Sequence, residues 1–294
     1  MKSALDIAVV ILTVSMMFSV GLELETSQFK NLAHDKTAFL GALIGQMVIL
    51  PAIGIFVVRT IRLPESVQMG FLLLAACPVG DVANFYTLIA RGDPALSVMV
   101  NSISSLLSCF TMPAVFAIYS KAMGTDFPFS VPVLTLVERL IVLVAVPVVG
   151  GMGLRAIRSG LADKISRKLR IACVAGVLVL CLIMIASRHE QLRLSWRAVF
   201  LASLSLIVVA MAGGCAIGQV LKLKKQEVIT VAILLPVRNV GLAVTIAVTL
   251  MDRSEYVVLA TVYFLTETIF LLGSTVLFRY LSAVTPRSIL LGDG

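Results

Sequence analysis

The chain has few charged residues and few metal-ligating residues for its length. Only 14 % of its 294 residues are Asp, Glu, Lys or Arg, and it has two histidines. A soluble domain of this size carries roughly 25 % charged residues. The small number of charges argues against a soluble protein, so the net charge of +8 does not indicate a nucleic-acid partner. Two histidines near loops also leave a histidine-based metal site without ligands. We therefore expect neither an enzyme nor a nucleic-acid-binding protein.

The spacing of the cysteines does not indicate disulfide bonds. The five cysteines all fall inside apolar stretches without CxxC spacing: Cys77, Cys109, Cys173, Cys181 and Cys215. We interpret them as small buried hydrophobic residues, not as disulfides or metal ligands. No Lys/Arg-rich start with a small-residue cleavage site precedes the first apolar run, so we expect Met1 to begin the mature chain. We expect no cofactor.

Apolar residues dominate what is present. They make up 59 % of the chain, and the mean hydropathy is +1.04. A transmembrane helix needs about 20 such residues. The sequence predicts an all-α polytopic membrane protein with one transmembrane domain over residues 1–294. Its nine predicted spans are 4–22, 37–59, 66–90, 94–121, 130–154, 168–188, 196–222, 226–251 and 255–283.

The distribution of lysine and arginine predicts the orientation of the chain. The loops after spans 1, 3, 5 and 7, with the C-terminus, carry the majority of the 24 basic residues. Six of them are predicted to lie in one loop: Arg155, Arg158, Lys164, Arg167, Lys168 and Arg170. Because cytoplasmic loops are rich in Lys and Arg, we expect a cell (inner) membrane protein with its C-terminus cytoplasmic and its N-terminus outside.

Two predicted spans are interrupted in the same way. Residues 78–87 read PVGDVANFYT and residues 236–245 read PVRNVGLAVT, with proline, both valines and threonine at the same offsets. A proline inside an apolar helix removes a backbone donor and disrupts the helix. Matching interruptions in two halves indicate the binding site of a secondary transporter. The broken spans are the third and the eighth, so they run in opposite directions. This predicts an inverted repeat whose broken helices cross near the midplane of the membrane.

Asp81 and Asn239 follow the two breaks and can cap the new half-helices. The partial positive charge at these helix ends suits an anionic ligand or a carboxylate. Arg238 keeps its charge at membrane depth and needs a partner, for which we expect Asp81. A permanent Arg238–Asp81 pair, or a residue that only caps a helix, is the purely structural alternative for these positions.

Four further residues carry polar groups within apolar spans. Glu267 is a candidate proton carrier or a neutral structural acid. Gln46 is strongly polar in the middle of its span, and we expect it to point toward the crossing. Ser97 and Asn101 belong to a polar stripe that either packs helices together or reaches a hydrophilic cavity.

These residues resemble the bile acid:sodium symporter family over nearly the whole chain. The matching segments are 17–24 (MFSVGLEL), Gln46 with Leu50-Pro51, 77–80 (CPVG), Asn84, 90–97 (ARGDPALS), and Asn239 with 241–243 (GLA). The resemblance implies a core domain and a panel domain that move past each other to give alternating access. The chain is similar to the nine-helix form of the family, without the first helix.

The resemblance also implies two sodium sites, which carry over only in part. The first is represented by Asn84, Ser97 and Asn101, with Ala83 where a serine is usual. The glutamate shared by both sites falls on Leu234, and a glutamine of the second site falls on Arg238. Only Gln46 and backbone carbonyls then remain of the second site. We therefore expect the second site to be lost and the first to be weak or lost, with Arg238 replacing a bound cation.

The predicted function is secondary transport of small organic solutes, in particular carboxylates or organic anions, by a sodium-independent carrier in membrane lipid. The predicted substrate-binding residues are Asp81, Asn84, Arg238, Asn239 and Glu267. The predicted remnant of the cation sites is Gln46, Asn84, Ser97 and Asn101.

Several alternatives stay open. One is a sodium-coupled symporter of bile acids or other organic anions, and another is a proton-coupled carrier that uses Asp81 and Glu267. A sensor or channel scaffold that has lost transport, an oxyanion or weak-acid exporter, and an intramembrane protease with Asp81 and Glu267 are more distant alternatives. The sequence leaves the substrate and the oligomeric state undetermined.

Overall fold

A computed structural model describes residues 2–24, 36–61, 63–124, 132–187, 189–253 and 255–284. Within these ranges the regular elements are helices, and one isolated antiparallel bridge joins Val79 to Arg238. The expected all-α class is therefore confirmed for the described part of the chain. The predicted break 23–36 lies largely outside these residues. Of the predicted break 121–126, residues 121–123 belong to the last turn of the helix 94–123, and only 125 and 126 lie outside the described residues.

The helices follow one another with short connections. In chain order they are α1 (Lys2–Glu23), α3 (Lys36–Ile44), η1 (Gly45–Ile49), α4 (Leu50–Thr60), α5 (Glu65–Ala76), α6 (Val82–Ile89), α7 (Pro94–Met123), α8 (Val133–Leu140), η2 (Ile141–Ala145), α9 (Val146–Ile157), α10 (Ser159–Ser187), α11 (His189–Val220), α12 (Lys225–Leu234), α13 (Val240–Thr249) and α14 (Glu255–Val284). Among the described residues, six helical stretches are long and apolar enough to cross a membrane. The chain is a multi-pass membrane protein.

Two predicted loops are helical instead. Residues 155–168 were expected to connect two spans, but α9 continues to Ile157 and α10 begins at Ser159. Residues 188–197 were expected to be a second connection, yet α11 begins at His189. Charged residues mark where a helix is too polar for hydrocarbon, but they are good helix formers and do not end a helix. The polar segments are therefore extensions of α10 and α11.

Two helices widen into a π-helical turn ahead of a proline. The π-helical segment η1 lies before Pro51, and η2 lies before Pro147. A proline has no N–H to donate to the preceding turn, so the helix upstream must adjust its hydrogen bonds. Such π-helical turns are frequent at functional sites. In η1 the widened turn carries Gln46.

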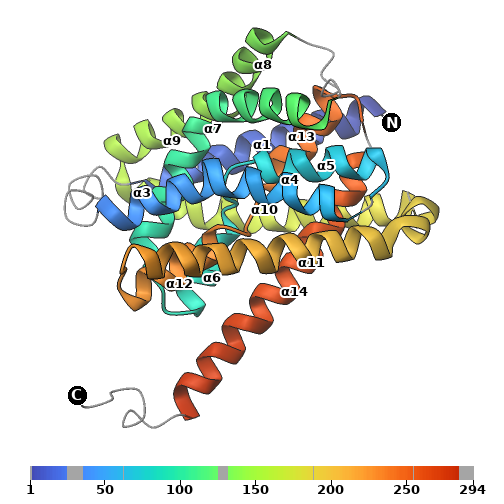
Figure 1. Ribbon diagram of the computed structural model, residues 1–294. Coiled ribbons are helices and arrows are strands. Elements are labelled where there is room, and N and C mark those ends of the chain that lie inside the picture. The colour runs from blue at the N-terminus through green and yellow to red at the C-terminus, as the bar shows by residue number, and fades with distance from the viewer. Residues whose placement is uncertain are drawn as a thin grey trace.

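The helices lie side by side in a bundle, from which the C-terminal part of α14 extends (Figure 1). One group is formed by α1 with α9 and α10, and α11 packs along α12. The long helix α14 packs against α5, α11 and α13. Both interrupted helices, α5/α6 and α12/α13, therefore lie among α1, α7, α11 and α14.

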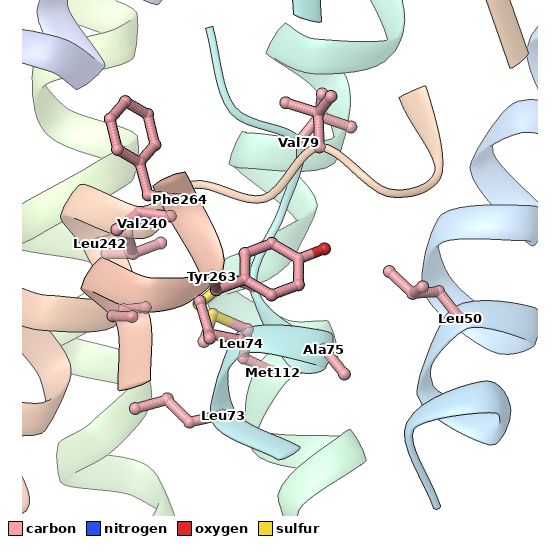
Figure 2. Close-up of a cluster of buried hydrophobic side chains, with 14 of the residues drawn as sticks. Leu50, Leu73, Leu74, Ala75, Val79, Met112, Val240, Leu242, Tyr263 and Phe264 are labelled. Carbon is pink, nitrogen blue, oxygen red and sulfur yellow. The ribbon is translucent and has the colours of Figure 1, made fainter. Parts of the chain in front are cut away.

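The buried core surrounds the two interruptions. Figure 2 shows apolar side chains from α4, α5, α7, α13 and α14 around the two extended segments. Tyr263 is fully buried there, and its hydroxyl donates to the carbonyl of Pro236 at 2.5 Å. Thus α14 supplies a hydrogen-bond donor to one of the backbone carbonyls that lose their helical partner at the second interruption.

Candidate functional site

The two interruptions meet in direct backbone contact. Residues 77–81 and 235–239 form the breaks, and they cross at the Val79–Arg238 bridge. The N–H of Asn239 donates to the carbonyl of Pro78 at 2.9 Å, and the N–H of Gly80 donates to the carbonyl of Val237 at 3.4 Å. Each break therefore supplies hydrogen-bond partners for backbone groups of the other, and buried backbone groups require such partners.

Glycine is needed at position 80 because the segments approach so closely. A Cβ atom on Gly80 would lie 2.6 Å from the carbonyl oxygen of Arg238. That distance is below any normal contact between these atoms. The crossing thus depends on Gly80 in the first segment facing Arg238 in the second.

The two half-helices that leave the crossing are capped differently. The Oδ1 atom of Asn239 accepts the N–H of Leu242 at 2.9 Å, so the predicted cap of α13 is confirmed. Asp81 occupies the corresponding position before α6, but its side chain makes no capping hydrogen bond. Instead, Asp81 Oδ1 accepts the amide of Asn101 at 3.0 Å. The predicted cap by Asp81 is therefore wrong, because α7 supplies a side-chain donor that the sequence repeat does not contain.

Arg238 is buried at 2 % exposure, and its guanidinium is surrounded by oxygen atoms. Nη1 donates to the carbonyl of Cys77 at 2.9 Å, and Nη2 donates to the carbonyl of Leu234 at 2.9 Å. Nη2 also donates to Oε1 of Gln46. The expected partnership with Asp81 is wrong: within the described residues the guanidinium forms no ion pair with Asp81. Its charge is stabilised by one side-chain amide and two backbone carbonyls.

Gln46 points toward the crossing, as predicted. Its Nε2 atom donates to the carbonyl of Leu234 at 2.5 Å, while its Oε1 atom accepts from Arg238. Gln46 is 5 % exposed and comes from the π-helical turn η1. Because Nη2 of Arg238 donates to the same carbonyl of Leu234, these three residues form a closed hydrogen-bonded triangle.

Glu267 approaches the crossing from α14. Its side chain is buried at 1 % exposure, and Oε2 accepts the backbone N–H of Arg238 at 3.3 Å. The carboxylate is therefore bound to the peptide backbone of the second interruption and not to the Arg238 guanidinium. This contact places Glu267 beside Arg238, and its role in substrate binding stays a prediction.

Two of the three residues of the first predicted cation remnant, Asn84 and Ser97, bind each other. Ser97 Oγ donates to Asn84 Oδ1 at 2.7 Å, and Thr87 Oγ1 donates to Ser97 Oγ at 3.4 Å. Asn84 Nδ2 donates to Oε2 of Glu23 at 3.1 Å. Asn101, by contrast, reaches Asp81. The structure therefore separates this remnant into an Asn84–Ser97 pair and an Asn101–Asp81 pair.

Glu23 and Arg170 are site residues that the sequence reasoning did not select. Glu23 ends α1, and it forms an ion pair with Arg170 of α10 and accepts Ser166 Oγ at 3.3 Å. Glu23 is part of the matching segment 17–24, which was the only available signal. Arg170 was interpreted as a loop charge because the start of α10 was placed too late in the chain.

A cavity of about 530 Å³ lies between α6, α10 and α14, beside the crossing. Its polar lining consists of Asp81, Tyr86, Arg170 and Thr268. The apolar lining consists of Val82, Phe85, Ile171, Val174, Ala175, Leu178, Phe264, Leu265 and Leu272. A smaller cavity of about 30 Å³ shares Asp81 and Arg170 with it and reaches Arg238 and Asn239. The crossing thus opens onto a mainly apolar chamber with a few polar groups, the usual form of a small-molecule site.

Comparison with known proteins identifies the family. The model of the Sodium Bile acid symporter family matches residues 10–195, which is more than half of the chain. The chain belongs to the sodium bile acid symporter family. The resemblance stated from the motifs is therefore confirmed. Members of this family are membrane transporters, so the chain is not an enzyme.

Curated relatives cover most of the chain at low identity. The uncharacterized sodium-dependent transporter YocS of Bacillus subtilis is 25 % identical over 79 % of the chain and 70 % of its own length. The probable sodium/metabolite cotransporter BASS1 of Arabidopsis thaliana is 28 % identical over 80 % of the chain and 57 % of its own length. The hepatic sodium/bile acid cotransporter of Rattus norvegicus is 28 % identical over 53 % of the chain. This match spans 43 % of the length of the rat protein.

Proposed function

We propose that this protein is a secondary transporter of small organic solutes that carry a carboxylate, working by alternating access and without sodium. The substrate binds in the chamber beside the crossing, between α6, α10 and α14. The names of the relatives support an organic solute, since BASS1 is described as a sodium/metabolite cotransporter and the rat protein as a sodium/bile acid cotransporter.

The observation that carries the sodium-independent mechanism is the environment of Arg238. A bound sodium ion needs several oxygen ligands, as hard cations generally do. Three oxygens of this kind, from Gln46, Leu234 and Cys77, already accept hydrogen bonds from the guanidinium. Arg238 therefore supplies a fixed positive charge at the place where the family resemblance puts the second cation.

The first cation remnant supports the same proposal. Asn84 Oδ1 already accepts Ser97 Oγ, and position 83 is an alanine without a side-chain oxygen. The family glutamate of both sites is replaced by Leu234, which is fully buried. No carboxylate comes from position 234, and the amide oxygen of Asn84 already accepts Ser97. The neighbouring carboxylates of Glu23 and Asp81 are hydrogen-bonded to Asn84 and Asn101. The remnant therefore has few oxygens that are not already engaged.

We further propose that the molecule is built as an inverted repeat of nine spans. In this arrangement α5/α6 and α12/α13 are the two broken spans, and α1, α8, α9 and α10 form a panel that moves against the remaining helices. Two observations support this arrangement. Val79 and Arg238 form an antiparallel contact, and both breaks share the pattern PVxxV, at residues 78–82 and 236–240. The basic residues around the start of α10 support a cytoplasmic C-terminus, an outside N-terminus and an inner-membrane location.

A sodium titration tests this proposal. Purified protein in proteoliposomes is given labelled cholate, octanoate or L-phenylalanine, each of which carries a carboxylate, in sodium, potassium or choline buffer. Saturable uptake that is equal in all three buffers is the expected result. Uptake that requires sodium would overturn the cation replacement, and binding without saturable uptake would identify a sensor instead of a carrier.

A proton-coupled carrier is the second candidate. It is favoured by Asp81, whose carboxylate lines both cavities without an ion-pair partner among the described residues. Uptake driven by an imposed pH gradient, and lost in the Asp81→Asn variant, would select this mechanism over simple uniport.

A further inference from the structure

The ionic groups around the chamber are not balanced. Arg170 lines both cavities, but its guanidinium is paired with Glu23 of α1. Glu23 also holds Asn84 and Ser166, so it remains fixed beside Arg170. Asp81 accepts only the neutral amide of Asn101, and it forms no ion pair with any described residue. Arg238 reaches the smaller cavity, but its guanidinium donates to Gln46 and to two backbone carbonyls. Of the acidic groups that line the chamber, Asp81 is thus the one without an ion-pair partner among the described residues.

An unpaired donor lies close to this carboxylate. Asn239 is buried at 1 % exposure and lines the smaller cavity together with Asp81. Its Oδ1 atom is fixed by the N–H of Leu242, so its amide orientation is determined by the cap of α13. The Nδ2 donor then has no hydrogen-bond partner among the residues that the structure describes. A buried polar group without a partner is costly, and a ligand acceptor would remove that cost.

Apart from the hydroxyl groups of Tyr86 and Thr268, the remaining wall of the chamber is apolar. Val82 and Phe85 of α6, Ile171 and Val174 of α10, and Phe264 of α14 line it. These side chains cannot hydrogen-bond a sugar or a polycarboxylate. The ligand must therefore have a polar end for Asp81 and Asn239 and an apolar body for this wall.

We infer that the chamber recognises a zwitterionic amphiphile, with its ammonium group on Asp81, its carboxylate on the Nδ2 donor of Asn239, and its apolar body in the larger cavity. An α-amino acid with a large apolar side chain has this chemistry. The inference rests on the proposed function and narrows its substrate class. A simple carboxylate would place a second negative charge beside Asp81, and a simple amine would leave the Asn239 donor unpaired.

The experiment compares three molecules that share one apolar body. Wild-type protein in nanodiscs is titrated with L-phenylalanine, 3-phenylpropionate, which lacks the amine, and 2-phenylethylamine, which lacks the carboxylate. We expect phenylalanine to bind at least about tenfold more tightly than either analogue, a difference that corresponds to the loss of one charge-assisted contact. Equal or tighter binding of either analogue, or no binding of the three, overturns the inference.

Two substitutions assign the two ends of the ligand. Asp81→Asn keeps the shape of the side chain and should favour 3-phenylpropionate over phenylalanine. Asn239→Asp keeps the oxygen that caps α13 but removes the Nδ2 donor. It should weaken the binding of phenylalanine by about tenfold. Asp163→Asn, at an exposed carboxylate on α10, is the matched control and should leave all three affinities unchanged. If Asp81→Asn left the preference for phenylalanine intact, the ammonium would not bind there and the inference would be wrong.

Uptake in proteoliposomes separates this inference from the proposed function. Tight binding of phenylalanine without saturable uptake of any probe would contradict the carrier and leave the ligand class standing. Saturable uptake of cholate or octanoate without binding of phenylalanine would support the carrier and overturn the zwitterion.

Discussion

Arg238 and Gln46 are bound to each other and to the same backbone oxygen. Nη2 of Arg238 and Nε2 of Gln46 both donate to the carbonyl of Leu234, and Nη2 also donates to Oε1 of Gln46. The contact joins the π-helical turn η1 to the end of α12, at the point where the second interrupted helix breaks. The guanidinium thus acts as a structural bridge between two elements that are far apart in the sequence.

Removing the Arg238 side chain should destabilise the protein strongly. Arg238→Met leaves Gln46 Oε1 and two carbonyl oxygens buried without their charged donor. A buried acceptor left without a donor costs about 1–3 kcal/mol, and Oε1 of Gln46 and the carbonyl of Cys77 are two such acceptors. Arg238→Lys keeps the charge but loses at least one hydrogen bond, and should cost about 1–3 kcal/mol. Thermal unfolding in detergent measures both, with the exposed Arg167→Met as the matched control. If Arg238→Met lowered the stability no more than Arg167→Met does, the bridging role of Arg238 would be contradicted.

The coupling between Arg238 and Gln46 can be measured separately. In a double-mutant cycle of Arg238→Met and Gln46→Leu, the two residues are in direct contact, so their effects should not add. We expect an interaction free energy of about 1–3 kcal/mol, because each single variant already removes the hydrogen bond between Nη2 of Arg238 and Oε1 of Gln46. Additive effects within about 0.5 kcal/mol would show that the two side chains stabilise the crossing independently.

A methyl group at Gly80 should separate the two interrupted helices. The added Cβ of Gly80→Ala would lie 2.6 Å from the carbonyl oxygen of Arg238, which is backbone and cannot rotate away. Overpacking of this kind costs about 1–3 kcal/mol, and here it also weakens the backbone bridge. Gly153→Ala is the control, because no atom other than its chain neighbours and its own helix backbone lies within 4 Å of its Cβ position, and alanine favours the helix there. Equal unfolding temperatures for the two variants would contradict the close crossing.

Asp93 and Asp81 both precede a helix, but only Asp93 should matter as a cap. Asp93 Oδ1 accepts the N–H groups of Ala95 and Leu96 at 2.9 and 3.1 Å at the start of α7. Asp93→Ala should therefore cost about 1–2 kcal/mol, and Asp93→Asn much less. Thermal unfolding of the two Asp93 variants tests this difference. If Asp93→Ala were no less stable than Asp93→Asn, the two amide contacts would not stabilise α7.

The backbone breaks could be predicted from the sequence, whereas the partners of the polar groups could not. Proline at 78 and 236 disrupts a helix wherever it stands, so the interruptions follow from local chemistry. Arg238 and Asp81 were expected to pair because the repeat puts them at one crossing. The guanidinium extends instead toward η1, and Asp81 turns to Asn101 of α7. Which of several polar neighbours a long side chain reaches depends on how separate helices pack, and no local pattern contains that information.

Glu23 and Arg170 illustrate the same limit. Each looks like a residue at the polar end of a span, and only the packing of α1 against α10 brings them together. The charge run 155–170 was interpreted as a loop because hydropathy separates membrane from water but does not separate helix from loop. The helix α10 begins at Ser159. Arg170 therefore belongs to a helix and lines the chamber, and it is not part of a solvated loop.

Restoring the residues that the family resemblance assigns to the cation sites should create a response to sodium. In the double variant Leu234→Glu/Arg238→Gln, a carboxylate replaces an apolar side chain and the fixed cation is removed. Gln46 Oε1 and the carbonyls of Leu234 and Cys77 then lose their charged donor and are available to a metal ion. Because a ligand that binds only the folded state stabilises it, sodium at 100 times its dissociation constant should raise the stability by about 2.7 kcal/mol. The single variant Arg238→Gln, which lacks the carboxylate, is the matched control and should respond weakly. Thermal unfolding in sodium and in potassium measures the difference, and a double variant that is equally stable in both salts would show that Arg238 does not stand in for a cation.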